Sequence, residues 1–173
     1  MEGEVVPVYG QGFFHIAKGI IYYTIVYDYL ERGSAGKVVD EPALRREEEE
    51  YIARSMQELM DEERVIINGE EVRCIVDSAF LERRGRRLHS AVIHARMHYR
   101  PRPGNNVYEN FYEAEEAPYP YTVYWVAPPG GRIVSVDTPG NVEMRAGGRI
   151  AMIRVARGTA LSGYEAVVFR LGR

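Results

Sequence analysis

The chain has 173 residues, 46% of them apolar, which is enough to bury one hydrophobic core and predicts a single domain over residues 1–173, with two small domains as the alternative. Its net charge of −3 argues against a protein dedicated to nucleic-acid binding. The single cysteine, Cys74, excludes an internal disulfide framework and a multi-cysteine zinc site.

The N-terminus and the apolar runs predict a cytoplasmic protein with no membrane partner. The first residues, MEGEVVPVYGQG, lack the basic and apolar regions of a secretory signal. The most apolar run, residues 20–27, is too short to cross a bilayer. A lone cysteine suits the reducing interior of a cell, and the scarcity of cysteine and glutamine indicates a thermophilic source.

An opening β-hairpin is predicted on either side of Lys18-Gly19. Residues 13–17 and 20–29 are rich in β-branched and aromatic side chains, which favour strands. A helix over residues 20–32 is the alternative for the second segment.

One long amphipathic helix is predicted over about residues 41–63, with Asp40 as its cap and with Glu41 and Pro42 in its first turn. The run of glutamates at residues 47–50 is expected to face solvent. Apolar side chains recur at three- and four-residue steps and are expected to pack on the sheet. They are Leu44, Tyr51, Ile52, Met56, Leu59 and Met60, with Ser55 among them.

A long hairpin with a basic tip is predicted over residues 70–100. It follows Asn68-Gly69, a strong signal for a tight turn, so a three-stranded meander is expected directly after the helix.

The register of this hairpin depends on its turn. A two-residue turn at Arg84-Gly85 would place Arg73 directly opposite Arg96. Because side chains alternate along a strand, one face of the hairpin is then expected to pack in the core. That face holds Val72, Cys74, Val76, Ser78, Phe80, Ala91, Ile93, Ala95, Met97 and Tyr99.

Residues 105–120 mix tyrosine with glutamate and predict a loop packed by its own aromatic side chains, with Tyr119-Pro120 as a candidate cis peptide. Short strands with glycine or proline turns then fill residues 121–171. The predicted fold class is α+β and predominantly antiparallel: a sandwich or partly open barrel of about 8–10 strands, with the long helix packed on it.

The polar face of the hairpin is a candidate anion-binding site. Two arginines that face each other need an acidic group or a bound anion to compensate their charge. A carboxylate beside a histidine also suits general acid–base chemistry. One alternative is therefore a small enzyme or a ligand-binding protein that holds a small anion. Its candidate residues are Arg73, Asp77, His94, Arg96 and His98.

No metal, cofactor or catalytic residue is assigned. His94 and His98 would lie roughly 13 Å apart along a strand, too far to share one ion. Cys74 falls on the apolar face, where a thiol is inert. The chain has no P-loop, dinucleotide fingerprint or nucleophile elbow, and the glycines at residues 10 and 12 are too few to form such a loop.

A second alternative is nucleic-acid binding through the basic tip of the hairpin. Tyr99 and Tyr108 would be the stacking platforms, whereas the acidic helix and the acidic residues at 109–116 oppose this interpretation. The candidate residues of the tip are Arg83, Arg84, Arg86 and Arg87.

The leading interpretation is a non-catalytic binding or assembly protein that engages another protein or itself, as a homo-oligomer. No catalytic constellation assembles in the sequence. Exposed sheet edges, abundant tyrosine and the single Trp125 are features that self-association uses.

Overall fold

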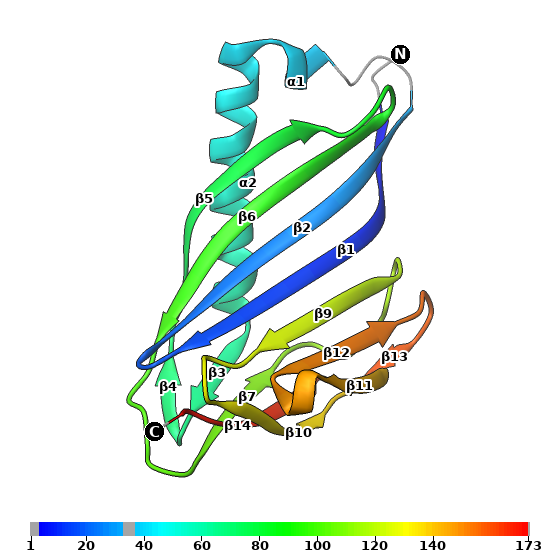
Figure 1. Ribbon diagram of the computed structural model, residues 1–173. Helices are drawn as coiled ribbons and strands as arrows, with labels where there is room; N and C mark the ends of the chain where they lie inside the picture. Colours follow the sequence, from blue (N-terminus) through cyan, green and yellow to red (C-terminus); the bar gives the residue numbers. More distant parts are fainter. Residues whose placement is uncertain (1–3, 33–36, 173) are drawn as a thin grey trace.

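Two open β-sheets and one long helix make up the fold (Figure 1). The computed structural model describes residues 4–32 and 37–172. The predicted fold class is confirmed, since the structure is α+β with mainly antiparallel strands. The strands run from β1 to β14, more than the expected number, because several of them are only two to five residues long.

The large sheet has seven strands, in the spatial order β11 (Asn141–Arg145), β12 (Ile150–Val155), β9 (Tyr121–Val126), β1 (Glu4–Ala17), β2 (Ile20–Arg32), β6 (Leu88–His98) and β5 (Cys74–Arg83). The second sheet has five, in the order β10 (Arg132–Asp137), β14 (Tyr164–Arg170), β7 (Asn105–Phe111), β3 (Arg64–Ile67) and β4 (Glu70–Val72). A short pair is formed by β8 (Glu115–Glu116) and β13 (Ala160–Leu161). The helical elements are α1 (Lys37–Asp40), α2 (Pro42–Glu62) and the 3-10 turn η1 (Ala146–Gly148).

The opening hairpin is confirmed, and the helical alternative for residues 20–32 is wrong. β1 and β2 pair along their length, and Gly19 supplies the φ of +83° that the turn requires. β1 also pairs in parallel with β9, with Gly10 opposite Tyr121. This parallel pairing joins the hairpin to the C-terminal strands.

The predicted helix is confirmed as α2, but its cap differs from the prediction. Glu41 is the N-cap, whereas Asp40 belongs to α1 and binds Arg83 at 2.6 Å. In the described residues, no helix is long and apolar enough to span a membrane.

α2 packs on the large sheet through only part of its predicted apolar face. Leu44, Tyr51 and Leu59 are exposed, because the helix meets one sheet along a narrow stripe. The side chains that pack against Ile25, Ala79 and Ile93 of the sheet include Ile52, Ala53, Met56 and Met60.

The predicted long strand over residues 70–83 is divided between the two sheets. The tight turn is confirmed, since Asn68 and Gly69 have φ of +56° and +81° and join β3 to β4. β4 stays in the second sheet, whereas β5 pairs with β6 in the large sheet. The predicted three-stranded meander is therefore wrong, because the chain changes sheet at Arg73.

The predicted register of the β5–β6 hairpin is also wrong. Ile75, and not Arg73, lies opposite Arg96. The turn is longer than two residues, since the amides of Arg84 and Gly85 donate to the Leu88 carbonyl at 2.9 and 3.1 Å. Arg83 pairs with His89, so the turn is centred on Arg86 and not between Arg84 and Gly85, and every cross-strand partner changes.

A β-bulge between Val76 and Ser78 exchanges the two faces of β5 partway along the strand. Before the bulge, Cys74 is buried as predicted. Beyond it Ala79 is buried, and Phe80, which was expected in the core, is 48% exposed. The inward residues of β6 and the residue that follows it agree with the prediction: Ala91, Ile93, Ala95, Met97 and Tyr99 are all buried.

Side chains of α2 hold the irregular edge of β5. Gln57 accepts a hydrogen bond from the Val76 amide at 2.8 Å and donates one to the Cys74 carbonyl at 3.0 Å. Glu49 accepts a hydrogen bond from the Leu81 amide at 2.9 Å, so the glutamate run is more than a solvated face. The helix thus supplies partners that the bulged strand lacks.

Residues 105–111 form β7, a central strand of the second sheet, so the predicted loop is wrong there. Asn106, Tyr108 and Asn110 point inward and are buried. The sequence did not show the alternation of polar and apolar side chains that is typical of a strand, because two of the inward positions hold asparagine. The Tyr119–Pro120 peptide bond is trans.

The core that joins the two sheets is an aromatic stack around Phe14 of β1. Its ring stacks on Tyr23 of β2 at 3.9 Å and on Trp125 of β9 at 4.0 Å between centroids. Tyr108 of β7 meets the Trp125 ring edge-on at 4.8 Å. This stack fixes the second sheet against the inner face of the large one, and a pocket remains beside it.

Candidate ligand-binding site

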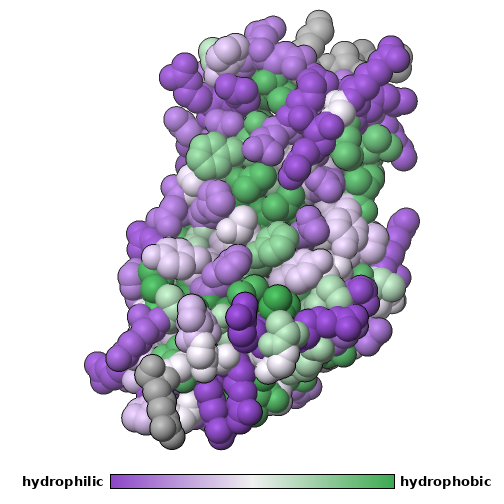
Figure 2. All heavy atoms as spheres, viewed as in Figure 1, coloured by the Kyte–Doolittle hydropathy of each residue, from purple (hydrophilic) through white to green (hydrophobic). Residues whose placement is uncertain are grey.

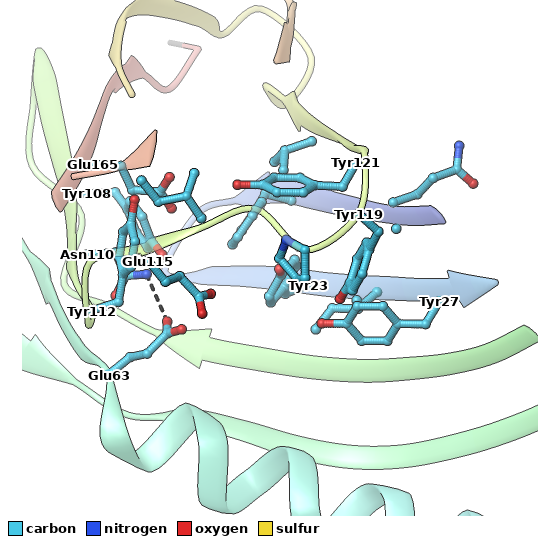
Figure 3. A pocket seen from close by; sticks show the side chains of 18 residues that line it. Tyr23, Tyr27, Glu63, Tyr108, Asn110, Tyr112, Glu115, Tyr119, Tyr121 and Glu165 are labelled. Atoms are coloured by element: carbon cyan, nitrogen blue, oxygen red, sulfur yellow. Dashed lines mark hydrogen bonds between the residues drawn. The ribbon is translucent and has the colours of Figure 1, made fainter. Parts of the chain in front are cut away.

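A pocket lies between the two sheets, next to the C-terminal end of α2 (Figure 3). One part has a volume of about 250 Å³, and an adjoining part along α2 has about 510 Å³. The two parts share Phe14, Tyr23, Tyr27, Glu63 and Glu115 in their walls, so we call them together the inter-sheet pocket. Strands of both sheets and the segment that leads into β9 line it.

Tyrosine side chains form most of the aromatic wall of the inter-sheet pocket. Burial raises the pKa of Tyr23, Tyr27 and Tyr108 well above the usual range and raises that of Tyr112 to about 12. Their hydroxyl groups are therefore neutral and offer hydrogen bonds, and their rings offer π faces. The six tyrosines of the wall are Tyr23, Tyr27, Tyr108, Tyr112, Tyr119 and Tyr121.

Two glycines of β1 keep the pocket open on the side of the large sheet. A Cβ atom at Gly10 would lie 3.2 Å from the ring of Tyr119, and one at Gly12 would lie 3.2 Å from the ring of Tyr23. Side chains at these positions would therefore press on the aromatic wall. The Gly10-Gln11-Gly12 segment was a weak local signal of the pocket in the sequence.

Glutamates gather at one end of the inter-sheet pocket, where α2, β7 and β14 meet. Asn110 donates a hydrogen bond from Nδ2 to Glu63 Oε2 at 2.8 Å, and Thr138 donates one to Glu165 Oε2 at 3.2 Å. Glu115 lies beside Glu63 in Figure 3. The glutamates that line the two parts are Glu62, Glu63, Glu113, Glu115 and Glu165.

The enclosure of these carboxyl groups shifts their protonation. Burial raises the pKa of Glu165 to about 7, the hydrogen bond from Thr138 offsets part of the rise, and the negative charge of Glu63 adds to it. Burial likewise raises the pKa of Glu63, against the hydrogen bond from Asn110, and Glu115 adds to the rise. Negative charge is thus costly in this pocket as long as nothing positive accompanies it.

No positively charged side chain compensates these carboxylates within the pocket. Among the lining residues that the structure describes there is no arginine, lysine or histidine. The chain as a whole has 22 basic residues. Their exclusion from a pocket with several glutamates leaves a site of strongly negative character.

The residues predicted to hold an anion lie outside this pocket, and only some of them are together. Arg73 binds Asp61 of α2 at 2.7 Å. Arg96 binds Asp77 at 3.0 Å, and its Nη1 lies 3.1 Å from His98 Nε2. Since the two arginines do not face each other, the reason for expecting a bound anion is wrong, and anion binding stays a prediction.

His94, the remaining candidate for anion binding, lies on the same exposed face as Arg96. Its Nδ1 is 3.2 Å from Thr24 Oγ1, and Phe80 meets its ring edge-on at 5.9 Å. Among the described residues, no group of three or more His, Cys, Asp or Glu side chains is placed to hold a metal ion. Burial raises the pKa of the Cys74 thiol to about 12, so this residue is not an activated nucleophile.

The basic tip of the β5–β6 hairpin is tied to the rest of the protein. Arg83 binds Asp40, Arg84 donates a hydrogen bond to Ser90 at 3.1 Å, and Arg87 donates one to the Glu31 carbonyl at 3.1 Å. The proposed stacking platforms are wrong, because Tyr99 and Tyr108 are both buried. Nucleic-acid binding by Arg83, Arg84, Arg86 and Arg87 stays a prediction.

The chain matches no family model and no curated protein sequence. Among solved structures it is similar to native leukotriene A4 hydrolase from Saccharomyces cerevisiae, with a TM-score of 0.45 and 8% identity over 95% of this chain and 29% of that chain. The yeast enzyme in complex with bestatin gives a TM-score of 0.38 and 9% identity over 94% and 28%. The chain thus spans less than a third of these enzymes, and we base no inference on the likeness.

Proposed function

We propose that the protein is a non-catalytic binding protein and that the inter-sheet pocket takes a small organic cation. One observation carries this proposal. Five glutamates and six tyrosines line the pocket, and no basic side chain does so among the described residues. A cationic ligand would supply the positive charge that these glutamates lack.

Two physical effects favour a cation in such a pocket. A carboxylate shielded from bulk water attracts a positive charge more strongly than an exposed one does. The faces of tyrosine rings carry negative potential and attract cations that approach within about 6 Å. The rings also provide apolar contact, so an organic cation fits the lining better than a simple metal ion does.

The absence of an activated nucleophile among the lining residues supports binding rather than catalysis. Cys74 lines the pocket as a thiol with a pKa of about 12, and the buried tyrosines are neutral. Burial raises the pKa of Glu165 to about 7, in the range of a general acid or base, yet its hydrogen-bond partners, Thr138 and Asn110, are both neutral groups. We therefore assign no catalytic step to it.

The test is the urea unfolding midpoint in the presence of organic cations and, separately, of phosphate and nucleotides. Urea is needed because guanidinium is itself an organic cation. A cation at a hundred times its dissociation constant should add about 2.7 kcal/mol to the free energy of unfolding. A shift with phosphate and none with cations would instead favour the Arg96 face.

The matched variants are Glu165→Gln and Glu116→Gln. Each removes one carboxylate from the same region, but only Glu165 lines the pocket, whereas Glu116 is exposed on β8. Loss of the cation effect in the first variant and its retention in the second is the expected result. Equal loss in both would contradict the proposal, because it would show a general effect of charge.

Assembly with a second copy or with another cytoplasmic protein is the second candidate function. The face of β2, β5 and β6 turned away from α2 mixes hydrophobic with hydrophilic side chains (Figure 2), and Tyr22 and Phe80 on it are 50% and 48% exposed. Light scattering tests self-association. A monomer at every concentration would refute the homo-oligomer, and a dimer that Phe80→Glu converts to a monomer would support it.

A further inference from the structure

Asn110 has a buried hydrogen-bond acceptor with no partner. The residue is 6% exposed, and its Nδ2 is directed to Glu63 Oε2 at 2.8 Å. Its Oδ1 is buried and finds no partner among the described residues, although the residue lines the inter-sheet pocket. Most buried side-chain carbonyl oxygens are paired with protein or water, so this one can accept a hydrogen bond from a donor that enters the pocket.

The register of the second sheet brings two carboxylates to the same place. Asn110 of β7 lies opposite Glu165 of β14 on one side and opposite Val65 of β3 on the other. Glu63 precedes Val65 by two residues, so the end of α2 carries its carboxyl group to Asn110. Figure 3 shows the three side chains together at one end of the pocket.

Three acceptor groups therefore converge from three separate elements. An alkylammonium group carries three N–H donors and one positive charge, which match two carboxylates and one neutral amide oxygen. A quaternary ammonium group has no N–H and would leave Asn110 Oδ1 unpaired. A guanidinium group presents its donors in a flat fork that suits a single carboxylate.

The other end of the pocket has a different character. Tyr27 and Tyr119 lie away from Glu63 and Glu165 in Figure 3, on the side of the β1 glycines, and the Tyr121 ring extends from that side with its hydroxyl toward Glu165. This aromatic end suits an apolar or aromatic body, which binds by burial and ring stacking. A ligand with its charge at one end only would fit both parts of the pocket.

From this geometry we propose that Asn110, Glu63 and Glu165 form a recess for a primary ammonium group, so that the ligand is a small primary amine with an apolar or aromatic body. The inference rests on the proposed function and adds to it the chemistry of the head group. Asn110 is then a specificity-determining residue, because it distinguishes an ammonium with three N–H groups from one that is fully methylated.

The experiment is calorimetric titration of the whole protein with three probes of one shape: 2-phenylethylamine, its N,N,N-trimethyl derivative and 2-phenylethanol. Hexylamine, its trimethyl derivative and hexanol repeat the comparison with a flexible body. We expect the primary amine to bind at least about tenfold more tightly than the trimethyl cation, a free-energy difference of about 1.4 kcal/mol. The neutral alcohol should bind more weakly than either cation.

Asn110→Leu should reduce the preference for the primary amine to about twofold or less, while Glu116→Gln should leave it unchanged. If Asn110→Leu does not fold, the comparison of the three probes on the unmodified protein still tests the ammonium recess. Equal or tighter binding of the trimethyl cation would overturn the ammonium recess and leave the cation pocket standing. Binding of neither cation, or of the alcohol as strongly as the amine, would overturn both.

Discussion

Among the described residues, charged side chains have partners of opposite charge on one side of the large sheet and lack them in the pocket on the other side. On the face turned away from α2, Arg96 is paired with Asp77 at 3.0 Å. On the opposite side, in the inter-sheet pocket, Glu63 at the end of α2 and Glu165 of β14 have neutral hydrogen-bond donors, Asn110 and Thr138. A cluster of charged residues therefore indicates a binding site where no opposite charge accompanies it, and not where charged residues are most abundant in the sequence.

The largest expected effect comes from neutralising the inner carboxylates. Glu63→Gln combined with Glu165→Gln should weaken binding of a primary amine by about 100-fold, or about 2.7 kcal/mol, because both charged acceptors are lost. The same variant should unfold at a higher urea concentration, since the pKa of both carboxyl groups is raised and their like charges disappear. Calorimetry and urea unfolding measure the two effects, and a loss of binding together with a loss of stability would indicate simple misfolding.

The second effect concerns the pH dependence of stability. Folding raises the pKa of Glu165 from 4.5 to about 7, so the folded state keeps a proton that the unfolded chain loses. The free energy of unfolding should therefore fall by roughly 1–3 kcal/mol as pH rises through this interval. Urea unfolding at several pH values measures it. Glu165→Gln should remove most of the slope, and a slope of the opposite sign would contradict the assignment.

A smaller effect is expected from filling the pocket on the side of β1. Gly12→Ala places a methyl group 3.2 Å from the Tyr23 ring, in an extended strand that accepts alanine. Amine binding should weaken by about tenfold because the aromatic end narrows. Stability should change by less than about 1 kcal/mol, since the backbone gains rigidity while the ring must shift slightly. Unchanged affinity would exclude this part of the pocket from the site.

The smallest effect is expected on the outer face. Asp77 and Arg96 are partly exposed, at 41% and 33%, so a double-mutant cycle with Asp77→Asn and Arg96→Gln should give a coupling of less than about 1 kcal/mol. Amine affinity should not change. An effect of either variant on amine binding would contradict the division between the two faces.

Local signals predicted much of the fold. Lys18-Gly19 and Asn68-Gly69 are turn signals between strand-forming runs, and both turns occur. The apolar periodicity of residues 42–62 predicted α2. These elements follow from neighbouring residues, so they can be inferred without knowledge of the rest of the chain.

Features set by distant residues could not be predicted in the same way. The bulge at Asp77 is held by Gln57 of α2, which is far away in the sequence. The parallel pairing of β1 with β9 joins residues more than a hundred positions apart. β7 was missed because Asn106 and Asn110 occupy inward positions, where a strand usually carries apolar side chains.

The candidate site was missed for a related reason. Glu63, Asn110 and Glu165 come from three elements of the chain, and none belongs to a recognisable motif. Gly10 and Gly12 gave a weak local signal, because two glycines on a strand have many explanations. The mixture of tyrosine and glutamate over residues 105–120 was interpreted as a loop packed by its own side chains. The sequence instead drew attention to Arg96 and its neighbours, where charges are abundant but are compensated by carboxylates.

The most direct test of the cation site is calorimetric titration of 2-phenylethylamine into the unmodified protein and into the Glu63→Gln, Glu165→Gln double variant, with 2-phenylethanol as the neutral control. We expect saturable binding of the amine to the unmodified protein, little binding of the alcohol, and loss of amine binding in the variant. Equal binding of amine and alcohol, or amine binding that survives in the variant, would contradict it.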